Sequence, residues 1–362
     1  MNRLGALLFV VTLLLSILGL FILYESSSYT ALLHLGDRYY FIKNQSIWLL
    51  SGVALSLVAI RVKRSLLYTI SLPLLVFSII LLLVVFLPGI GLELKGAHRW
   101  INFGFFVFQP SELLKVSLTL YLAAWLSVKE KGRLLAFLIL MGVSGGLVLL
   151  QPDLSTTFII VVTSVAVYFV SGASIKEMGM IFLIFAVLIG GLVGAKPYRV
   201  ARLTSFQNFD HSSISASSYH LNQIVIALGS GGLTGVGFGN SIQKYAYLPE
   251  NTTDSIFAIF AEEAGFVGSF LLIFLYLFQI LLGILIAARA STLFGRFLAA
   301  GITVFLAVQT LLNIASQAIL IPLTGVPLPF ISYGGSAMMI NYIAIGLLMN
   351  VSREEKLMRR KK

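Results

Sequence analysis

Ten long apolar runs occupy most of the sequence and restrict its fold more than any other feature. Each approaches the ~20 residues that a helix, rising ~1.5 Å per residue, needs to cross the hydrocarbon of a bilayer. Transmembrane strands would show short alternating segments, which these runs lack. The runs lie at about 4–24, 44–62, 66–88, 110–127, 134–151, 154–171, 177–195, 255–287, 296–320 and 335–351.

The composition agrees with lipid as the main solvent. Of the 362 residues, 58% are hydrophobic and only 11% are charged, so a single water-soluble core could not cover this much apolar surface. No small-residue cleavage site follows the first run, which we therefore expect to be a retained helix. The sequence predicts an all-α polytopic membrane protein, with ten transmembrane helices in one membrane domain over 1–362.

The distribution of basic residues predicts the orientation. With a cytoplasmic N-terminus, sixteen Lys and Arg residues fall on the cytoplasmic side and eight on the other, and Lys115 lies inside a run. Positive charge favours the cytoplasmic side, so we expect both termini there, including the basic tail 352–362. The extracytoplasmic loops are then about 89–109, 196–254 and 321–335, and the large one joins the seventh and eighth helices.

The net charge of +11 does not indicate a nucleic-acid-binding protein. Its basic residues are spread over loops on both faces instead of gathering on one domain, and anionic membrane lipids are the simpler partner. The chain has no cysteine, which excludes disulfides, thiolate catalysis and cysteine metal sites.

The first long loop and the turns near it contain several candidate site residues. Arg99 and Trp100 precede an aromatic stretch typical of a membrane interface. Pro110 suits the first turn of the fourth helix, and Glu112 and Lys115 are three residues apart, which allows an ion pair of structural or functional use. Asp153 is placed to cap the sixth helix.

The large loop ends in Leu248–Ala258, where Asp254 stands between an aqueous segment and a long apolar run. An aspartate before a helix is a good N-cap, but a carboxylate at this boundary could also act on a substrate that is part lipid and part sugar. On one helix, Glu262 would lie about 80° around from Asp254 and Glu263 about 180°. Only Glu262 could then share a cavity with Asp254, and Glu263 needs either a different neighbour or protonation.

Two glycine-rich stretches call for irregular backbone. Residues 229–239 hold many glycines, but no strand or βαβ unit surrounds them, so they do not indicate nucleotide binding. Tight re-entrant packing is favoured, and the alternative is that the glycines let backbone amides approach an anionic group. Residues 321–336 contain three prolines and three glycines, which prevent a continuous helix. Backbone of this kind at membrane depth must be lined by protein or water.

Six blocks of the sequence, in order, are similar to the SEDS family of FtsW, RodA and SpoVE proteins. The blocks are Gly96–Ile101, Phe108–Lys115, Gln151–Leu154, the glycines of 229–239, Leu248–Glu263 and Pro322–Ser336. The resemblance implies a ten-helix fold in the bacterial cytoplasmic membrane that polymerises lipid II, an undecaprenyl diphosphate-linked disaccharide pentapeptide, into glycan strands on the outer face.

The resemblance also implies roles for individual residues. Asp254 matches the essential aspartate of the family, whose proposed role is to take the proton from the acceptor sugar's 4-hydroxyl. Positive charge or a divalent cation, Mg²⁺ or Mn²⁺ with unidentified ligands, would stabilise the diphosphate leaving group. A class B penicillin-binding transpeptidase is the implied partner. The candidate substrate-binding residues are Arg99, Trp100, Glu112, Lys115, Arg199, Arg202, Lys244, Glu262, Ser332 and Ser336.

The chain departs from the family pattern at Ser155, Ser255 and Ala264, where glycine, phenylalanine and leucine are usual. None of these removes an ionisable group, and an FtsW-like division role is slightly favoured over a RodA-like role in elongation. One alternative is a flippase that moves lipid II across the membrane, although the halves show no internal repeat of the kind common in transporters. The other is a non-catalytic scaffold for the transpeptidase, which would not need Asp254.

Overall fold

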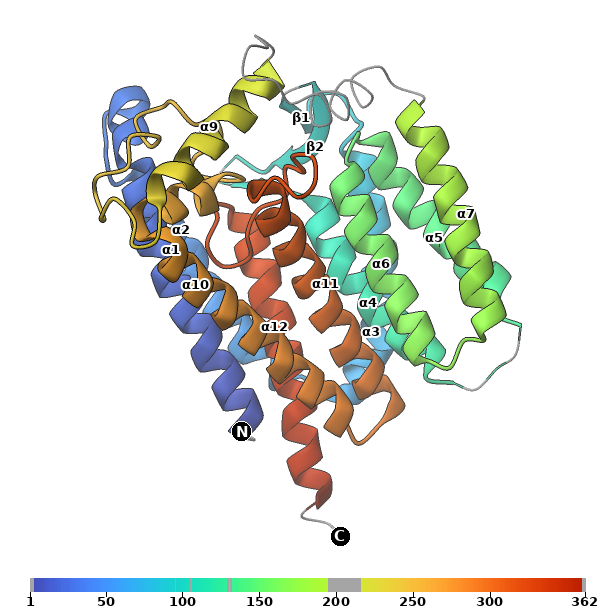
Figure 1. The fold of residues 1–362 in the computed structure, drawn as a ribbon. Helices are drawn as coiled ribbons and strands as arrows, with labels where there is room; N and C mark the ends of the chain where they lie inside the picture. The colour runs from blue at the N-terminus through green and yellow to red at the C-terminus, as the bar shows by residue number, and fades with distance from the viewer. Residues whose placement is uncertain are drawn as a thin grey trace.

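The computed structural model describes residues 3–94, 96–104, 106–128, 130, 132–194 and 216–359. Each predicted apolar run coincides with a helix, and the helices stand side by side in a bundle (Figure 1). They are α1 (Arg3–Leu35), α2 (Tyr40–Ala59), α3 (Arg64–Val84), α4 (Pro110–Leu126), α5 (Leu134–Leu150), α6 (Leu154–Val170), α7 (Ile175–Gly194), α10 (Ile256–Arg289), α11 (Leu293–Gln317) and α12 (Gly335–Arg359). A further helix, α9 (Ala216–Gly231), lies within the predicted large loop.

Among the described residues, six helices are long and apolar enough to cross a membrane, and α5 and α6 are shorter apolar helices. Large apolar side chains such as Leu14, Leu72 and Phe270 are exposed on the outer faces of these helices. Exposed apolar surface of this extent fits contact with lipid, so the structure is that of a mostly helical, multi-pass membrane protein.

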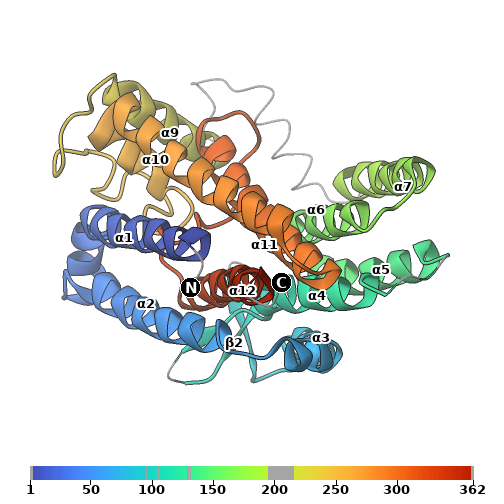
Figure 2. The same ribbon diagram turned by 90° about the horizontal axis from the view of Figure 1, so that it is seen from below.

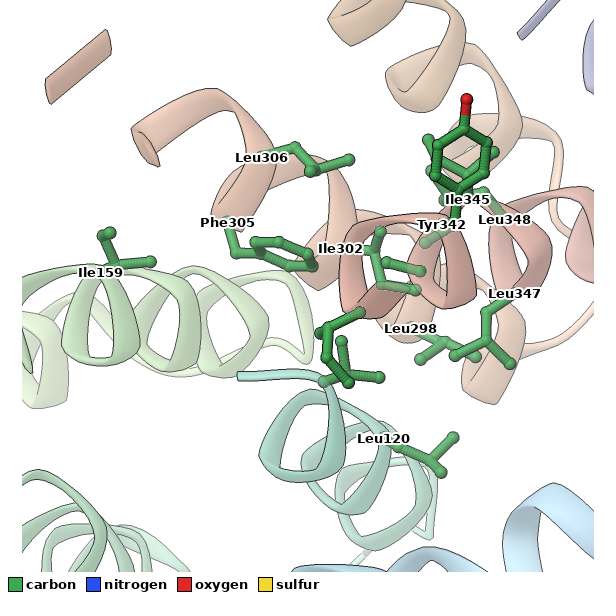
Figure 3. Packing of buried hydrophobic residues seen from close by; sticks show 14 of the residues in the cluster. Leu120, Ile159, Leu298, Ile302, Phe305, Leu306, Tyr342, Ile345, Leu347 and Leu348 are labelled. Atoms are coloured by element: carbon green, nitrogen blue, oxygen red, sulfur yellow. The ribbon is translucent and has the colours of Figure 1, made fainter. Parts of the chain in front are cut away.

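The helix α12 is the centre of the bundle. It packs against α1, α2, α4, α10 and α11, and Figure 2 shows it surrounded when the molecule is seen from below. Its Ile345 and Leu348 join Ile302 and Phe305 of α11 and Leu120 of α4 in one continuous apolar core (Figure 3).

The helix α1 is longer than predicted. The sequence predicts a span over 4–24, but the helix continues to Leu35, and within this extension the hydroxyls of Ser26 and Thr30 donate to backbone carbonyls of the same helix. At ~1.5 Å per residue its 33 residues extend about 50 Å, more than the ~30 Å of hydrocarbon. Gly36, with φ of 72°, follows its end.

The expectation of an all-α chain is wrong in one segment. The loop over 89–109 contains a three-stranded antiparallel sheet in the order β1 (Gly91–Leu94), β2 (Ala97–Asn102) and β3 (Val107–Phe108). Gly96, with φ of 73°, lies between β1 and β2, where a tight reversal favours glycine. The sequence of this segment lacks the periodicity of a helix, but from it we expected a stretch along the membrane interface and did not predict a sheet.

The bundle has two distinct ends. The start of α1 and the end of α12 lie at one end, whereas the sheet, α9 and the loop between α11 and α12 lie at the other (Figure 1). The polar segments that the sequence places in three separate loops therefore lie at the same end of the molecule.

Candidate functional site

The short segment 252–255 leads into α10 and contains the candidate catalytic carboxylate. Each of its four residues makes a hydrogen bond to a residue far away in the sequence. These bonds join Tyr333 N to Thr252 O (2.9 Å), Ser332 Oγ to Thr253 O (2.6 Å), Asn313 Nδ2 to Asp254 O (2.9 Å) and His220 Nε2 to Ser255 Oγ (2.7 Å). Residues from α9, α11 and the loop before α12 thus fix the backbone around Asp254.

The prediction that Asp254 caps the following helix is wrong. The helix α10 begins at Ile256, its N-cap is Ser255, and the Ser255 side chain makes no capping hydrogen bond. The predicted angle of about 80° between Asp254 and Glu262 assumed that both residues lie on one helix. It does not apply, because Asp254 precedes the helix.

The Asp254 side chain is half-buried and lies beside Gly325. A Cβ atom added to Gly325 would be 3.5 Å from Asp254 Oδ2, and the φ of 70° at Gly325 favours glycine. Next to it, Ser155 at the start of α6 donates to Thr324 O at 2.6 Å. Asp254 therefore faces the loop between α11 and α12, and that loop is attached to α6.

This loop, residues 318–334, has irregular backbone, as its prolines and glycines predict. Its backbone carbonyls are satisfied by side chains of the surrounding helices, as backbone at membrane depth requires. These bonds run from Asn313 Nδ2 to Val326 O (2.7 Å), Gln309 Nε2 to Pro327 O (3.1 Å), Tyr276 Oη to Pro329 O (2.5 Å) and Gln45 Nε2 to Ser332 O (3.0 Å). The loop is thereby held as one wall beside Asp254.

The ion pair predicted between Glu112 and Lys115 is present. Both side chains are buried, and Lys115 Nζ lies 2.9 Å from Glu112 Oε1 and donates to Gln309 Oε1 at 2.7 Å. Since Gln309 also holds Pro327, this cluster connects α4, α11 and the 318–334 loop. The positive charge of Lys115 is compensated inside the protein.

Of the two possibilities expected for Glu263, the structure shows a separate partner, Lys244. Lys244 Nζ lies 3.0 Å from Glu263 Oε1 and 3.3 Å from Glu25 Oε2 of α1. Burial alone would lower the pKa of Lys244, but the hydrogen bonds and negative charges of Glu263 and Glu25 outweigh it and raise the pKa. Lys244 is therefore a buried cation that joins the loop before α10 to α1.

The carboxylate of Glu262 is also hydrogen-bonded within the protein. Its carboxylate accepts hydrogen bonds from Ile242 N at 3.2 Å and Gln243 N at 3.4 Å, and it contacts the Ser241 hydroxyl. These bonds direct Glu262 towards residues 241–243, and it organises the loop before α10.

Two of the glycines in 229–239, Gly231 and Gly235, are packed closely against the backbone of α10. Val236 N and Gly237 N donate to Glu262 O and Glu263 O at 3.0 and 3.1 Å, next to a break in the helical backbone at Gly265. A Cβ atom on Gly235 would overlap the Glu263 carbonyl. The block is fitted against α10.

Comparisons with known proteins agree with this arrangement. The chain matches the cell cycle protein family FtsW/RodA/SpoVE over residues 5–357. The chain belongs to this family. It is 39% identical to stage V sporulation protein E of Bacillus subtilis, over 96% of each chain. It is 38% identical to the probable peptidoglycan glycosyltransferase FtsW of Coxiella burnetii, over 95% of this chain and 94% of the relative.

Solved structures of the family have the same fold. One belongs to a peptidoglycan synthase complex that coordinates polymerization and crosslinking, with a TM-score of 0.81, 26% identity and coverage of 96% of this chain and 97% of that chain. The rod shape determining protein RodA of Thermus thermophilus matches with a TM-score of 0.70 and 25% identity over 96% of each chain. The fold is RodA-like over nearly its whole length.

The other candidate residues of this FtsW/RodA/SpoVE chain have varied surroundings. Arg99 donates to Gln151 O at 2.9 Å and to Pro152 O at 2.5 Å, so it joins β2 to the turn before α6. Trp100 is half-buried opposite Leu92. Ser336 accepts from Gln109 N and donates to Val107 O, both at 3.1 Å. Arg199 and Arg202 lie outside the described residues.

The sequence reasoning missed two side chains that contact the Asp254 segment. Asn313 is an amide in an otherwise apolar run, a signal of a functional or structural contact in a membrane helix. His220 is one of four histidines and lies in a polar loop, where nothing in the sequence distinguishes it. Within the part of the chain that the structure describes, no three His, Asp or Glu side chains gather as a metal site.

Proposed function

We propose that this protein is a peptidoglycan glycosyltransferase that polymerises lipid II on the outer face of the bacterial cytoplasmic membrane. The observation that carries the proposal is the half-buried carboxylate of Asp254, whose backbone is fixed from three sides in a chain of the FtsW/RodA/SpoVE family. The relatives named FtsW supply the reaction type, and Asp254 supplies a group able to perform it.

In the proposed reaction, Asp254 is the general base. Its carboxylate takes the proton from the 4-hydroxyl of the acceptor sugar as that oxygen attacks the anomeric carbon of the donor. The new glycosidic C–O bond forms while the bond between that carbon and the diphosphate oxygen breaks, and undecaprenyl diphosphate leaves with the electron pair. A fixed carboxylate favours this step because it holds the base in one orientation.

The leaving group needs positive charge. Three of the cationic candidates, Arg99, Lys115 and Lys244, are engaged by carbonyls or carboxylates within the protein. We therefore assign the diphosphate to Arg199 and Arg202 of the large loop, and treat the other polar candidates as residues that shape the site.

We also propose that Mg²⁺ or Mn²⁺ accompanies the diphosphate. Such ions are commonly held by one or two carboxylates together with substrate phosphates, which fits a described region without a gathered metal site. When bound, the ion neutralises charge that develops on the leaving group.

For the membrane arrangement we propose ten transmembrane helices with both termini in the cytoplasm. The position of the start of α1 and the end of α12 at one end of the bundle supports this (Figure 1). The similarity to a chain of a synthase complex that coordinates polymerization and crosslinking supports a class B penicillin-binding transpeptidase as partner. The slightly favoured role is FtsW-like, in division.

The test is a reconstitution of the full chain in liposomes with labelled lipid II, Mg²⁺ or Mn²⁺, and the transpeptidase of its own organism. The proposal expects glycan polymer on a gel, and its loss on removing the divalent cation with a chelator. Transfer of lipid II between the leaflets without polymer would favour a flippase instead. Polymer that forms only when the partner carries a polymerase of its own would favour a scaffold.

A further inference from the structure

A hydrogen bond between α9 and the N-cap of α10 links a histidine to the residue next to Asp254. His220 Nε2 lies 2.7 Å from Ser255 Oγ, and Ser255 is fully buried. The contact joins residues 35 positions apart. It is the point at which α9 reaches the segment 252–255.

The Ser255 side chain is used in an unusual way. A serine at an N-cap ordinarily accepts a hydrogen bond from a backbone N–H of the first helical turn. Ser255 makes no such bond, and its hydroxyl is directed to the His220 ring instead. The contact between helices replaces the local cap.

The helix α9 packs against α10, which fixes the position of His220 relative to Ser255. Ile224 and Ala227 follow His220 at four and seven residues, so the three share one face of the helix. Ile224 and Ala227 are buried against Ala258 and Ile259 of α10. The face that packs on α10 therefore also presents His220 to Ser255.

We propose that His220 is a positioning residue for Asp254. Asn313 of α11 holds the carbonyl of Asp254 from one side, and His220 holds the neighbouring Ser255 from another. Loss of either support lets the Asp254 carboxylate leave the orientation that proton transfer requires. The role rests on the proposed glycosyltransferase function and gives His220 no contact with substrate.

The test measures polymerisation of lipid II by the full chain, with kcat and KM determined for each variant. His220→Ala is expected to lower kcat about tenfold, equivalent to about 1.4 kcal/mol of barrier, with KM within about twofold of the unaltered protein. His220→Gln keeps a polar nitrogen within reach of Ser255 and is expected to retain most of kcat. Tyr219→Phe is the matched control, because it removes a hydrogen bond from the same helix to Tyr247 O without touching Ser255.

A double-variant cycle tests the contact itself. Ser255→Ala is expected to reproduce the kcat loss of His220→Ala, and the combined variant is expected to be no slower than the slower single one. A kcat within twofold of normal in Ser255→Ala, losses that multiply in the double variant, or an equal loss in Tyr219→Phe would overturn the proposal. Ser255→Ala removes only one hydroxyl, so it tests the contribution of the His220–Ser255 contact to kcat even where His220→Ala does not fold. Absence of polymer from the unaltered protein would instead overturn the proposed function.

Discussion

Replacement of Lys244 by methionine tests whether the buried charges between the loop before α10 and α1 hold the structure together. The ammonium group serves both Glu263 and Glu25, at 3.0 and 3.3 Å. Lys244→Met keeps most of the side-chain volume but leaves the Glu263 carboxylate without its cation, although this side chain is only 3% exposed.

The expected loss of stability follows from these surroundings. Removing one partner of a buried ion pair typically costs about 3–5 kcal/mol. Here Glu263 keeps hydrogen bonds from Gly239 N (3.2 Å) and Ser241 N (3.4 Å), and Glu25 is 19% exposed to solvent. These features favour the lower end of this range of costs. We therefore expect the free energy of unfolding to fall by about 3 kcal/mol, which is about a 150-fold change in the unfolding equilibrium constant.

The assay is unfolding of the purified protein in mild detergent by titration with SDS, followed by tryptophan fluorescence. The double variant Lys244→Met with Glu263→Gln removes both charges of the closest pair and is expected to recover at least half of the loss. A loss below about 1 kcal/mol in the single variant, or a double variant less stable than the single one, would refute the assignment of Lys244 as the essential counter-charge.

Three further predictions concern the cap of α6, the loop beside the carboxylate and pH. Asp153 accepts from Thr156 N at 3.0 Å, so Asp153→Ala is expected to lower the free energy of unfolding by about 1 kcal/mol, whereas Asp153→Asn retains most of it in the same SDS titration. Gly325→Ala is expected to cost about 1–2 kcal/mol, because φ is 70°, and to slow polymerisation, because the new methyl group contacts Asp254. The pKa of Lys244 is raised above its ordinary value of 10.5. Its stabilising contribution is therefore fully present below pH 10.5 and lost as the pH rises through the higher folded value. The difference in melting temperature between the unaltered protein and Lys244→Met should therefore shrink as the pH is raised above 10.5.

Hydropathy was sufficient to locate the helices of the ten apolar runs, because in lipid each apolar segment must satisfy its own backbone as a helix, but it did not predict α9. Hydropathy alone did not predict where α1 ends or that a sheet forms between α3 and α4. The helix α1 continues through the polar residues Ser26 and Thr30, whose hydroxyls find acceptors within the helix, so the end of the apolar run did not mark the end of the helix. The sheet over 91–108 depends on pairing between strands, which single-strand patterns only weakly encode.

The site was predicted in part, for similar reasons. The pair Glu112–Lys115 and the cap by Asp153 depend on residues three positions apart, and the structure contains both. The cap by Asp254 failed because the helix begins one residue later than that cap requires. Ser255, which we regarded only as a departure from the family pattern, contacts His220, and no sequence rule relates residues so far apart.

The central claim is that Asp254 is the base of the polymerisation reaction, and Asp254→Asn tests it most directly. The amide has nearly the same shape, and it leaves the backbone hydrogen bond between Asp254 O and Asn313 in place, but it cannot accept the proton. Asp37→Asn is the matched control, because Asp37 is an exposed carboxylate paired with Lys43 and lies outside the site. With each protein folded and supplied with lipid II and divalent cation, we expect the initial rate of polymer formation to fall by at least about 10²-fold in Asp254→Asn and to remain unchanged in Asp37→Asn. An Asp254→Asn protein that polymerises lipid II within a few-fold of the unaltered rate would contradict the account.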